Sequence, residues 1–224
     1  MEKILLKIKA LFRKIGIEIA FVKKESDIIP LSHNTEQSMD AFWANPKNEK
    51  LWKSPALIGF YKHLVNLVIE NKFDLNNKKI LDAGCGTGSL LIFINAAFKP
   101  KTNFGYEFSK SALKIAKKRF PNATYQYKNL NEADNTKFDF IFCTEVLEHI
   151  ISPQIPLKNL INMMKENSGL LITVPNGRTD TFNGHINFWS PESWVAFIKD
   201  NTNNSLFKTG EIAGHGLYAI IRKK

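Results

Sequence analysis

The segment "KKILDAGCGTGSLL" (Lys78–Leu91) joins a short apolar run to a turn that is almost free of side chains. Gly84, Gly86 and Gly88 alternate there with other residues, most of them small. Glycine adopts positive φ without strain and lets backbone amides approach a ligand closely. The apolar stretch after the turn predicts a helix, and the first amides of a helix have no partner within it. We therefore expect a strand, a ligand-binding turn and a helix, in this order.

The chain continues to alternate in this way after the turn. Predicted strands span residues 79–83, 103–107, 124–128, 138–143 and 170–174, and predicted helices span about 54–71, 88–98, 110–119 and 154–166. Ser54, Ser109 and Ser190 stand where helix-capping hydroxyls are expected. Two apolar runs, 206–212 and 217–222, predict a terminal hairpin. We predict a Rossmann-like, doubly wound α/β fold whose seven-stranded sheet is mostly parallel, with an antiparallel C-terminal hairpin strand and helices on both faces.

Residues 1–53 differ in character from the single domain that we predict over residues 54–224. Apolar side chains in residues 1–22 repeat at helical spacing with basic residues between them. Two interpretations are open: a helix that packs on the domain or on a second subunit, or a basic amphipathic helix that contacts a membrane surface. Residues 26–54 predict an irregular or weakly helical connector of the kind that can fold over a site as a lid. No apolar run reaches the roughly 18 residues of a membrane span, so none is predicted.

Composition narrows the class of protein. Of the 224 residues, 44% are hydrophobic and 12% aromatic, which argues against wholesale disorder. The formal net charge of +10 favours acidic partners such as nucleic acid, an anionic membrane or a phosphorylated substrate. The lysines are spread along the chain, so nucleic-acid binding is not the leading expectation. Cys85 and Cys143 form no CxxC pair, so we predict no disulfide framework or zinc ribbon and expect a cytoplasmic protein.

Two carboxylates accompany the glycine turn. Asp82 precedes it by two residues, and Glu107 ends the next predicted strand, where a carboxylate can accept two hydrogen bonds from a ribose diol. The spacing G-x-G-x-G differs from the dinucleotide fingerprint, and Glu107 would repel a 2′-phosphate. The turn contains no lysine, which argues against a P-loop nucleotidase.

The stretches "ILDAGCGTGSL", "GYEFS", "FDFIFCTEVLEHI" and "GLLITVPN" together resemble the class I S-adenosylmethionine-dependent methyltransferases over about residues 54–222. In that family the aspartate and the glycine turn hold the methionine portion of the cofactor, and the glutamate holds the ribose. Asn129 stands where the family often has an aspartate for the adenine amino group, and Leu130 could pack on the ring. The cofactor-binding residues that the resemblance implies are Asp82, Gly84, Cys85, Gly86, Gly88, Glu107, Phe108, Asn129, Leu130 and Thr144. Because the sulfonium is already activated, the protein mainly has to align an acceptor.

A second motif, "TEVLEHI", follows the fourth predicted strand. Glu145, Glu148 and His149 are spaced i, i+3, i+4, which predicts one face of a helical turn at the active-site edge. Three interpretations stay open: the glutamates decorate a helix N-terminus, His149 with Glu145 serves as the catalytic base, or the group binds a divalent metal.

His185, after the fifth predicted strand, completes the candidate metal set Glu145, Glu148, His149 and His185. Such ligands suit magnesium, manganese, iron or zinc. The pattern resembles the ubiquinone-biosynthesis O-methyltransferases and the small-RNA 2′-O-methyltransferases, both thought to use the set as metal ligands. The sequence departs from each: Asn187 replaces the second histidine of the RNA enzymes, and the long insertion of the quinone enzymes is missing. Bacterial methyltransferases of sugar and polysaccharide pathways are more similar in this segment.

Three aromatic residues, Phe188, Trp189 and Trp194, follow His185 and predict either core packing or a wall of an acceptor pocket. The resemblance implies transfer of a methyl group from S-adenosylmethionine to an oxygen of a small molecule, such as a sugar, a nucleotide-linked sugar or a phenol. RNA 2′-O-methylation and a cofactor-binding scaffold without turnover are the alternatives. The sequence leaves the oligomeric state open.

Overall fold

The computed structural model describes residues 34–48, 54–182, 184–202, 205–212, 214 and 216–223. The predicted amphipathic helix of residues 1–22 lies outside the described residues. In the described part of the chain, no helix is both long enough and apolar enough to cross a bilayer.

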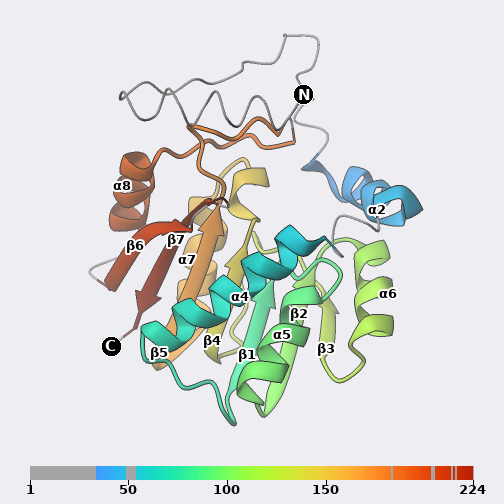
Figure 1. Ribbon diagram of the computed structural model, residues 1–224, viewed down its shortest axis with the longest axis horizontal. Helices are drawn as coiled ribbons and strands as arrows, with labels where there is room; N and C mark the ends of the chain where they lie inside the picture. The colour runs from blue at the N-terminus through green and yellow to red at the C-terminus, as the bar shows by residue number, and fades with distance from the viewer. Residues whose placement is uncertain are drawn as a thin grey trace.

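One seven-stranded sheet forms the centre of the molecule (Figure 1). The strands are β1 (Lys79–Ala83), β2 (Thr102–Glu107), β3 (Thr124–Tyr127), β4 (Phe138–Thr144), β5 (Met164–Val174), β6 (Leu206–Ile212) and β7 (Gly216–Arg222). Their order is β3-β2-β1-β4-β5-β7-β6, and β7 runs antiparallel to both β5 and β6 while the other pairs are parallel. The predicted doubly wound fold with its antiparallel terminal hairpin is therefore confirmed. The order reverses between β1 and β4, where ligands bind in such sheets.

Helices flank the sheet and connect its strands. They are α2 (Glu36–Ala44), α4 (Pro55–Glu70), α5 (Ser89–Phe98), α6 (Lys110–Arg119), α7 (Gln154–Met163) and α8 (Pro191–Asn201), with short 3₁₀ turns η3 (Pro46–Asn48) and η4 (Leu147–His149). Ser54, Ser109 and Ser190 each accept an amide hydrogen bond from the residue three positions on, so the predicted caps are confirmed.

Alternating side chains of the central strands bury two separate apolar layers. On one face, β1 contributes Ile80 to a cluster with helices α4 and α5, which lie toward the viewer in Figure 1. On the other face, Leu81 packs in a cluster with α7 and α8. Residues on successive strand positions point to opposite faces, so a strand covered on both sides needs an unbroken apolar run. This burial holds the carboxyl ends of β1, β2, β4 and β5 together at one edge.

The boundary between α7 and β5 differs from the prediction. The helix ends at Met163 rather than continuing to residue 166, and β5 begins at Met164 instead of Leu170. Met164 is buried and pairs with Phe138, and the β4–β5 register then shifts before the pairing of Phe140 with Gly169. Met164 is buried as part of the sheet. The boundary was misplaced because a short apolar run is compatible with either a buried helix or a buried strand.

Helix α2 lies beside α6 at the edge of the domain (Figure 1). Asp40 of α2 accepts hydrogen bonds from the Ser109 hydroxyl at 2.6 Å and from the Ser111 amide at 2.9 Å. The connector therefore caps the helix that follows β2, and its described part holds more regular helix than the sequence predicts.

Candidate functional site

The glycine turn has the conformation that its sequence predicts. Gly84, Gly86 and Gly88 have φ of 78°, 47° and 72°, and the amides of Gly84 and Cys85 donate to the Tyr106 carbonyl. A Cβ on Gly84 would lie 2.4 Å from Cγ2 of Val146, so this position accepts no side chain. The turn is thus held against β2 and ends where α5 begins, at Ser89.

Glu107 lies against the turn, with both carboxylate oxygens occupied by backbone donors. Oε2 accepts from the Gly86 amide at 3.0 Å, and Oε1 accepts from the amides of Phe108 and Ser109 at 2.9 Å. Burial raises the pKa of Glu107, and these amides partly oppose that rise. The strand-terminal carboxylate therefore braces the turn before any ligand binds.

Asp82 differs from Glu107 in having an unused oxygen. It is 2% exposed, and among the described residues its Oδ1 has no hydrogen-bond partner. Burial, and next the charge of Glu107, raise the pKa of Asp82 to about 8. A buried carboxyl group without a partner is costly, so a cationic ligand group beside the turn would relieve that cost.

A cavity of about 380 Å³ opens beside the carboxyl ends of β2 and β3, where Phe108 and Tyr127 line it. Its lining consists of Asn34, Thr35, Glu36, Phe108, Tyr127, Lys128, Asn129 and Glu132. The structure thus brings together the predicted cofactor residues Phe108 and Asn129. Leu130 packs against the apolar core, Cys85 is a buried residue of the turn itself, and Thr144 ends β4.

The connector supplies part of the site that sequence reasoning did not assign. Asn34 to Glu36 line the cavity, and the ring of Trp43 lies 3.3 Å from where a Cβ on Gly86 would sit. Trp43 was the feature of the sequence that could have indicated this contact. A large apolar side chain in a polar connector is expected to be buried against another part of the protein.

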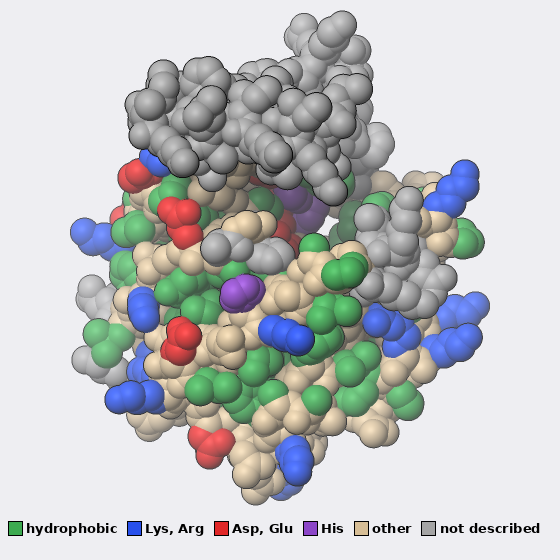
Figure 2. Space-filling model, viewed as in Figure 1, with side chains coloured by type: hydrophobic (Ala, Val, Ile, Leu, Met, Phe, Trp, Pro, Cys, Tyr) green, Lys and Arg blue, Asp and Glu red, His purple; other side chains and the backbone are tan. Residues whose placement is uncertain are grey.

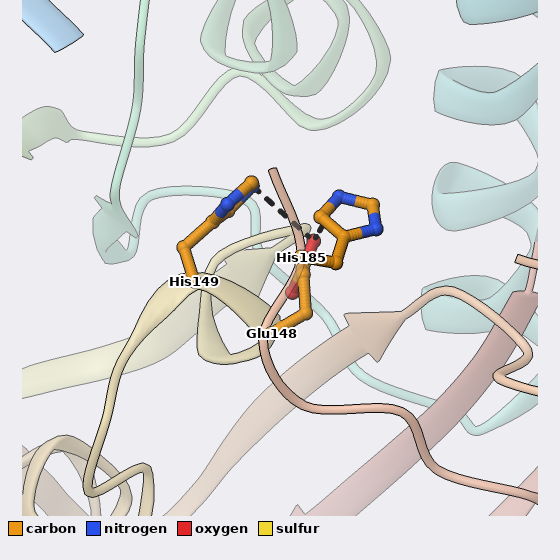
Figure 3. A group of neighbouring side chains, drawn as sticks. All are labelled: Glu148, His149 and His185. Carbon is orange, nitrogen blue, oxygen red and sulfur yellow. Dashed lines mark ion pairs between the residues drawn. The ribbon is translucent and has the colours of Figure 1, made fainter. Parts of the chain in front are cut away.

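Glu148, His149 and His185 form a second group at the same edge of the sheet (Figure 3). Glu148 and His149 belong to η4, and His185 lies on the loop after β5. Glu148 Oε1 is 3.8 Å from His149 Nε2 and 3.9 Å from His185 Nε2. The three residues offer ligand atoms that all lie within 4.8 Å of one another. Glu148 is fully buried, and neither of its oxygens has a hydrogen-bond partner among the described residues.

The outer nitrogens of both histidines face acceptors, which sets the tautomers. His149 Nδ1 is 3.0 Å from the Gly184 carbonyl and 3.2 Å from Asn34 Oδ1. His185 Nδ1 is 2.5 Å from Asp180 Oδ2. A carbonyl or carboxylate oxygen can only accept, so each Nδ1 carries the proton and each Nε2 presents its lone pair toward Glu148.

Burial dominates the protonation of this group. Burial raises the pKa of Glu148 well above its ordinary value, with the Glu145 charge adding to the rise. Burial, and next the neighbouring His185, lower the pKa of His149 to about 4. His149 is therefore a neutral imidazole at physiological pH, as a metal ligand or a base requires.

The prediction that Glu145 shares a helical face with Glu148 and His149 was wrong. Glu145 adopts a left-handed φ of 56°, and the 3₁₀ turn begins two residues later, at Leu147. The Glu145 amide donates to the Thr173 carbonyl, and its carboxylate accepts from the Thr173 hydroxyl at 2.9 Å. This tie to β5 bends the chain away from helix and keeps Glu145 out of the three-residue group. Burial raises its pKa to about 7.

Asn187 holds the His185 loop against η4. Its side-chain amide donates to the carbonyls of Leu147 and Ile150, and the amides of Ile186 and Asn187 donate to the Glu148 carbonyl. Asn187, which stands where the RNA enzymes have a second histidine, thus positions the loop. It is not part of the group formed by Glu148, His149 and His185.

Comparison with known proteins identifies the family. A family model described as "Methyltransferase domain" matches residues 56–204. The chain belongs to this methyltransferase family. The match confirms the class I S-adenosylmethionine-dependent methyltransferase that the sequence motifs predict.

The methyltransferase matches curated relatives over part of their length. It is 28% identical over 124 residues to "Putative methyltransferase 235L" of Invertebrate iridescent virus 6, covering 55% of this chain and 47% of that protein. It is 32% identical over 135 residues to "Ubiquinone biosynthesis O-methyltransferase" of Coxiella burnetii, covering 56% and 57%. The chain thus spans about half the length of these relatives.

Solved structures share the methyltransferase fold. The N-methyltransferase NodS from Bradyrhizobium japonicum, in complex with S-adenosyl-L-homocysteine, superposes with a TM-score of 0.66 at 16% identity, covering 85% of this chain and 98% of that one. Magnesium protoporphyrin IX methyltransferase from Synechocystis, with bound S-adenosylmethionine, gives 0.63 at 14% identity, covering 84% and 97%. At these identities the likeness establishes the fold.

The aromatic residues of the methyltransferase divide between core and surface. Trp189 and Trp194 are buried and pack together with Phe197, as expected of core residues. Phe188 is 52% exposed and is the member of the trio still available to line an acceptor site. Sequence reasoning also missed Asp180. The only indication in the sequence was that this acidic residue lies five positions before His185.

Proposed function

We propose that this protein transfers the methyl group of S-adenosylmethionine to an oxygen of a small-molecule acceptor. The observation that carries the proposal is the buried Glu148 carboxylate, which has no hydrogen-bond partner among the described residues and faces two imidazole lone pairs beside the glycine turn. The similarity to ubiquinone-biosynthesis O-methyltransferases supports oxygen as the acceptor atom. We assign catalysis to residues 54–224 and the cover of the site to the connector before them.

The residues of the turn fit S-adenosylmethionine. Asp82, with its unpartnered Oδ1, would receive the cationic methionine portion, and Glu107, already oriented by the turn, would meet the ribose. Phe108 and Asn129 line a cavity of about 380 Å³ that would take the adenine. When bound, the cofactor supplies an activated methyl group on a sulfonium, so the protein contributes alignment and exclusion of water.

The second group fits a divalent metal. Glu148, His149 and His185 would hold the ion, because the carboxylate lacks other partners among the described residues and both Nε2 atoms face it. Glu145 remains a candidate on the adjoining turn. Oxygen and imidazole ligands suit magnesium, manganese, iron or zinc. A bound metal would lower the pKa of an acceptor hydroxyl.

His149 and Glu145 are the candidates for moving the acceptor proton. The Gly184 carbonyl fixes the proton of His149 on Nδ1, which leaves Nε2 free to accept one. The pKa of Glu145 near 7 suits proton exchange at physiological pH. In the absence of a metal, His149 would act as the general base for the acceptor hydroxyl.

The face of the molecule drawn in Figure 2 favours a small acceptor over RNA. On the face drawn in Figure 2, lysine and arginine side chains are scattered instead of gathered in one stripe. An RNA footprint requires clustered basic side chains along one surface. We therefore propose a sugar, a nucleotide-linked sugar or a phenol, and keep RNA as an outcome of the test.

The test combines binding and turnover. Calorimetric titration with S-adenosylmethionine should show saturable binding that S-adenosylhomocysteine competes away. Radiolabelled methyl transfer is then measured on catechols, sugars, nucleotide sugars and RNA, with metal-free and metal-supplemented protein. Label on a small-molecule oxygen supports the proposal. Label on RNA, with affinity that falls steeply with salt, would assign the activity to RNA instead. Absence of cofactor binding would refute the proposal.

A further inference from the structure

We propose that Asp180 is a positioning residue that orients His185 for metal binding and supplies the second negative charge of the site. This inference rests on the proposed metal site at Glu148, His149 and His185. It adds to that site a residue outside the sequence motif, contributed by the loop after β5.

Both oxygens of Asp180 have partners that hold the carboxylate in place. Oδ1 accepts from the Phe182 amide at 2.9 Å, and Oδ2 lies 2.5 Å from His185 Nδ1. The Asp180 amide donates to the Asn176 carbonyl at 2.9 Å. The side chains of Asp180 and His185 are only 8% and 12% exposed, so water competes little for their hydrogen bond.

This hydrogen bond determines which nitrogen of His185 faces the site. With its proton on Nδ1, the ring directs the Nε2 lone pair toward Glu148, 3.9 Å away. Carboxylates that accept the outer N–H of a metal-binding histidine fix the ring and make it a better ligand. Asp180 has the position and the geometry of such an outer partner.

The two histidines have different outer partners. His149 donates toward a neutral carbonyl and a neutral amide oxygen, those of Gly184 and Asn34. His185 donates to a carboxylate. With a divalent cation bound, the carboxylates of Glu148 and Asp180 would supply two negative charges that balance it in a buried site. Asp180 therefore contributes to affinity through charge as well as through orientation.

The experiment compares Asp180→Asn with wild type and with Asp200→Asn. Asparagine can keep the hydrogen bond to the Phe182 amide while removing the charge. Asp200 is exposed on α8, so Asp200→Asn removes the same charge away from the site. Metal-free protein is titrated with Co²⁺ alone and followed by visible absorption, which reports affinity and coordination together. We expect Asp180→Asn to bind Co²⁺ about 10- to 100-fold more weakly with an altered spectrum, and Asp200→Asn to match wild type.

Two further measurements separate the possible failures. Affinity for S-adenosylmethionine and the unfolding temperature should stay near wild type in Asp180→Asn, which excludes general misfolding. Asp180→Glu retains the charge but displaces the carboxylate, and should bind Co²⁺ with intermediate affinity. If Glu148→Gln abolishes Co²⁺ binding while Asp180→Asn retains wild-type affinity and spectrum, the role of Asp180 is refuted and the metal site stands. If wild type binds no Co²⁺, both the metal site and this inference are refuted, while cofactor binding is tested independently.

Discussion

Two buried glutamates at the same edge of the sheet have opposite surroundings. Glu107, at the end of β2, accepts hydrogen bonds from three backbone amides. Glu148, on the turn after β4, has no hydrogen-bond partner among the described residues and faces two imidazole nitrogens. Burial raises the pKa of both carboxyl groups. Of the two, only Glu107 has backbone amides that offset the cost of burying its carboxyl group.

The two glutamates therefore differ in how far the described residues satisfy their buried carboxyl groups. An unsatisfied buried polar group costs about 1–3 kcal/mol, and more when it is charged. Glu107 avoids that cost by accepting from the backbone amides at the glycine turn, so the turn is held in place without a ligand. Glu148 retains the cost, which a bound cation would remove. The two regions should therefore respond differently to mutation.

The largest effect should come from the glycine that joins the two regions. Gly84→Ala places a non-glycine residue at a φ of 78° and a Cβ 2.4 Å from Val146, which immediately precedes η4. Backbone strain of about 1–3 kcal/mol and overpacking of about 1–3 kcal/mol should both lower the free energy of unfolding. Gly214→Ala is the control, because Gly214 has a φ of 77° and nothing within 4 Å of its Cβ position. Denaturant unfolding should show a larger loss for Gly84→Ala. Equal losses would mean that Val146 moves aside freely.

The next effect should fall on Glu148 alone. Glu148→Gln removes the carboxyl group that faces both imidazoles and that would bind the metal directly. Methyl transfer should therefore drop by more than about 100-fold, the upper end of the loss expected when only an outer partner of a metal ligand is removed. Affinity for S-adenosylmethionine, measured by calorimetry, should stay within about twofold of wild type, because Glu107 and the turn are unchanged. Wild-type turnover in Glu148→Gln would remove the functional contrast between the two glutamates.

Asp82 should affect the cofactor side instead. Asp82→Asn should weaken S-adenosylmethionine binding by about 10- to 100-fold, the value of a charge-assisted hydrogen bond. In the free protein the pKa of Asp82 is about 8, and a cationic ligand favours the ionised form. Binding near pH 7 should therefore release a proton, and affinity should rise with pH until about 8. Calorimetry in buffers of different ionisation enthalpy measures that proton, and Asp82→Asn should release none.

The smallest effect should come from Asp40. Asp40→Ala removes the acceptor of the Ser109 hydroxyl and the Ser111 amide, and loss of such a cap costs about 1 kcal/mol. The Ser109 hydroxyl, and next the Ser111 amide, lower the pKa of Asp40. Its contribution is thus present above its ordinary pKa of 3.8 and is lost as pH falls through the lowered value. Thermal unfolding should show the deficit at pH 7, and the deficit should shrink as the pH falls below 3.8. A deficit that does not change with pH would indicate a packing effect.

The sequence predicted the local structure best where a residue type strongly favours one backbone conformation or one position in a helix. Alternating glycines after a strand predicted the positive φ values of the turn, and serine before proline predicted the starts of α4 and α8. The position of Glu107 at a strand end placed it beside the turn. In each case local chemistry decides the structure, so no distant contact was needed.

Tertiary contacts decided the features that the sequence did not predict. Glu145 leaves the expected helical face because Thr173, on β5, binds both its amide and its carboxylate. Asp180 reaches His185 only because the loop after β5 turns back on itself. Asn34 lies 115 positions before His149, a pairing that no local pattern could reveal.

The placement of the connector sets a limit on how this domain can be cut. The family match begins at residue 56, yet Asn34, Asp40 and Trp43 lie before that boundary and touch the imidazole, the α6 cap and the glycine turn. A truncation at residue 54 would keep every matched motif and remove the residues that contact His149, the start of α6 and the glycine turn. We therefore expect the segment that can be transferred to another protein with its contacts intact to begin before residue 56, where the family match begins.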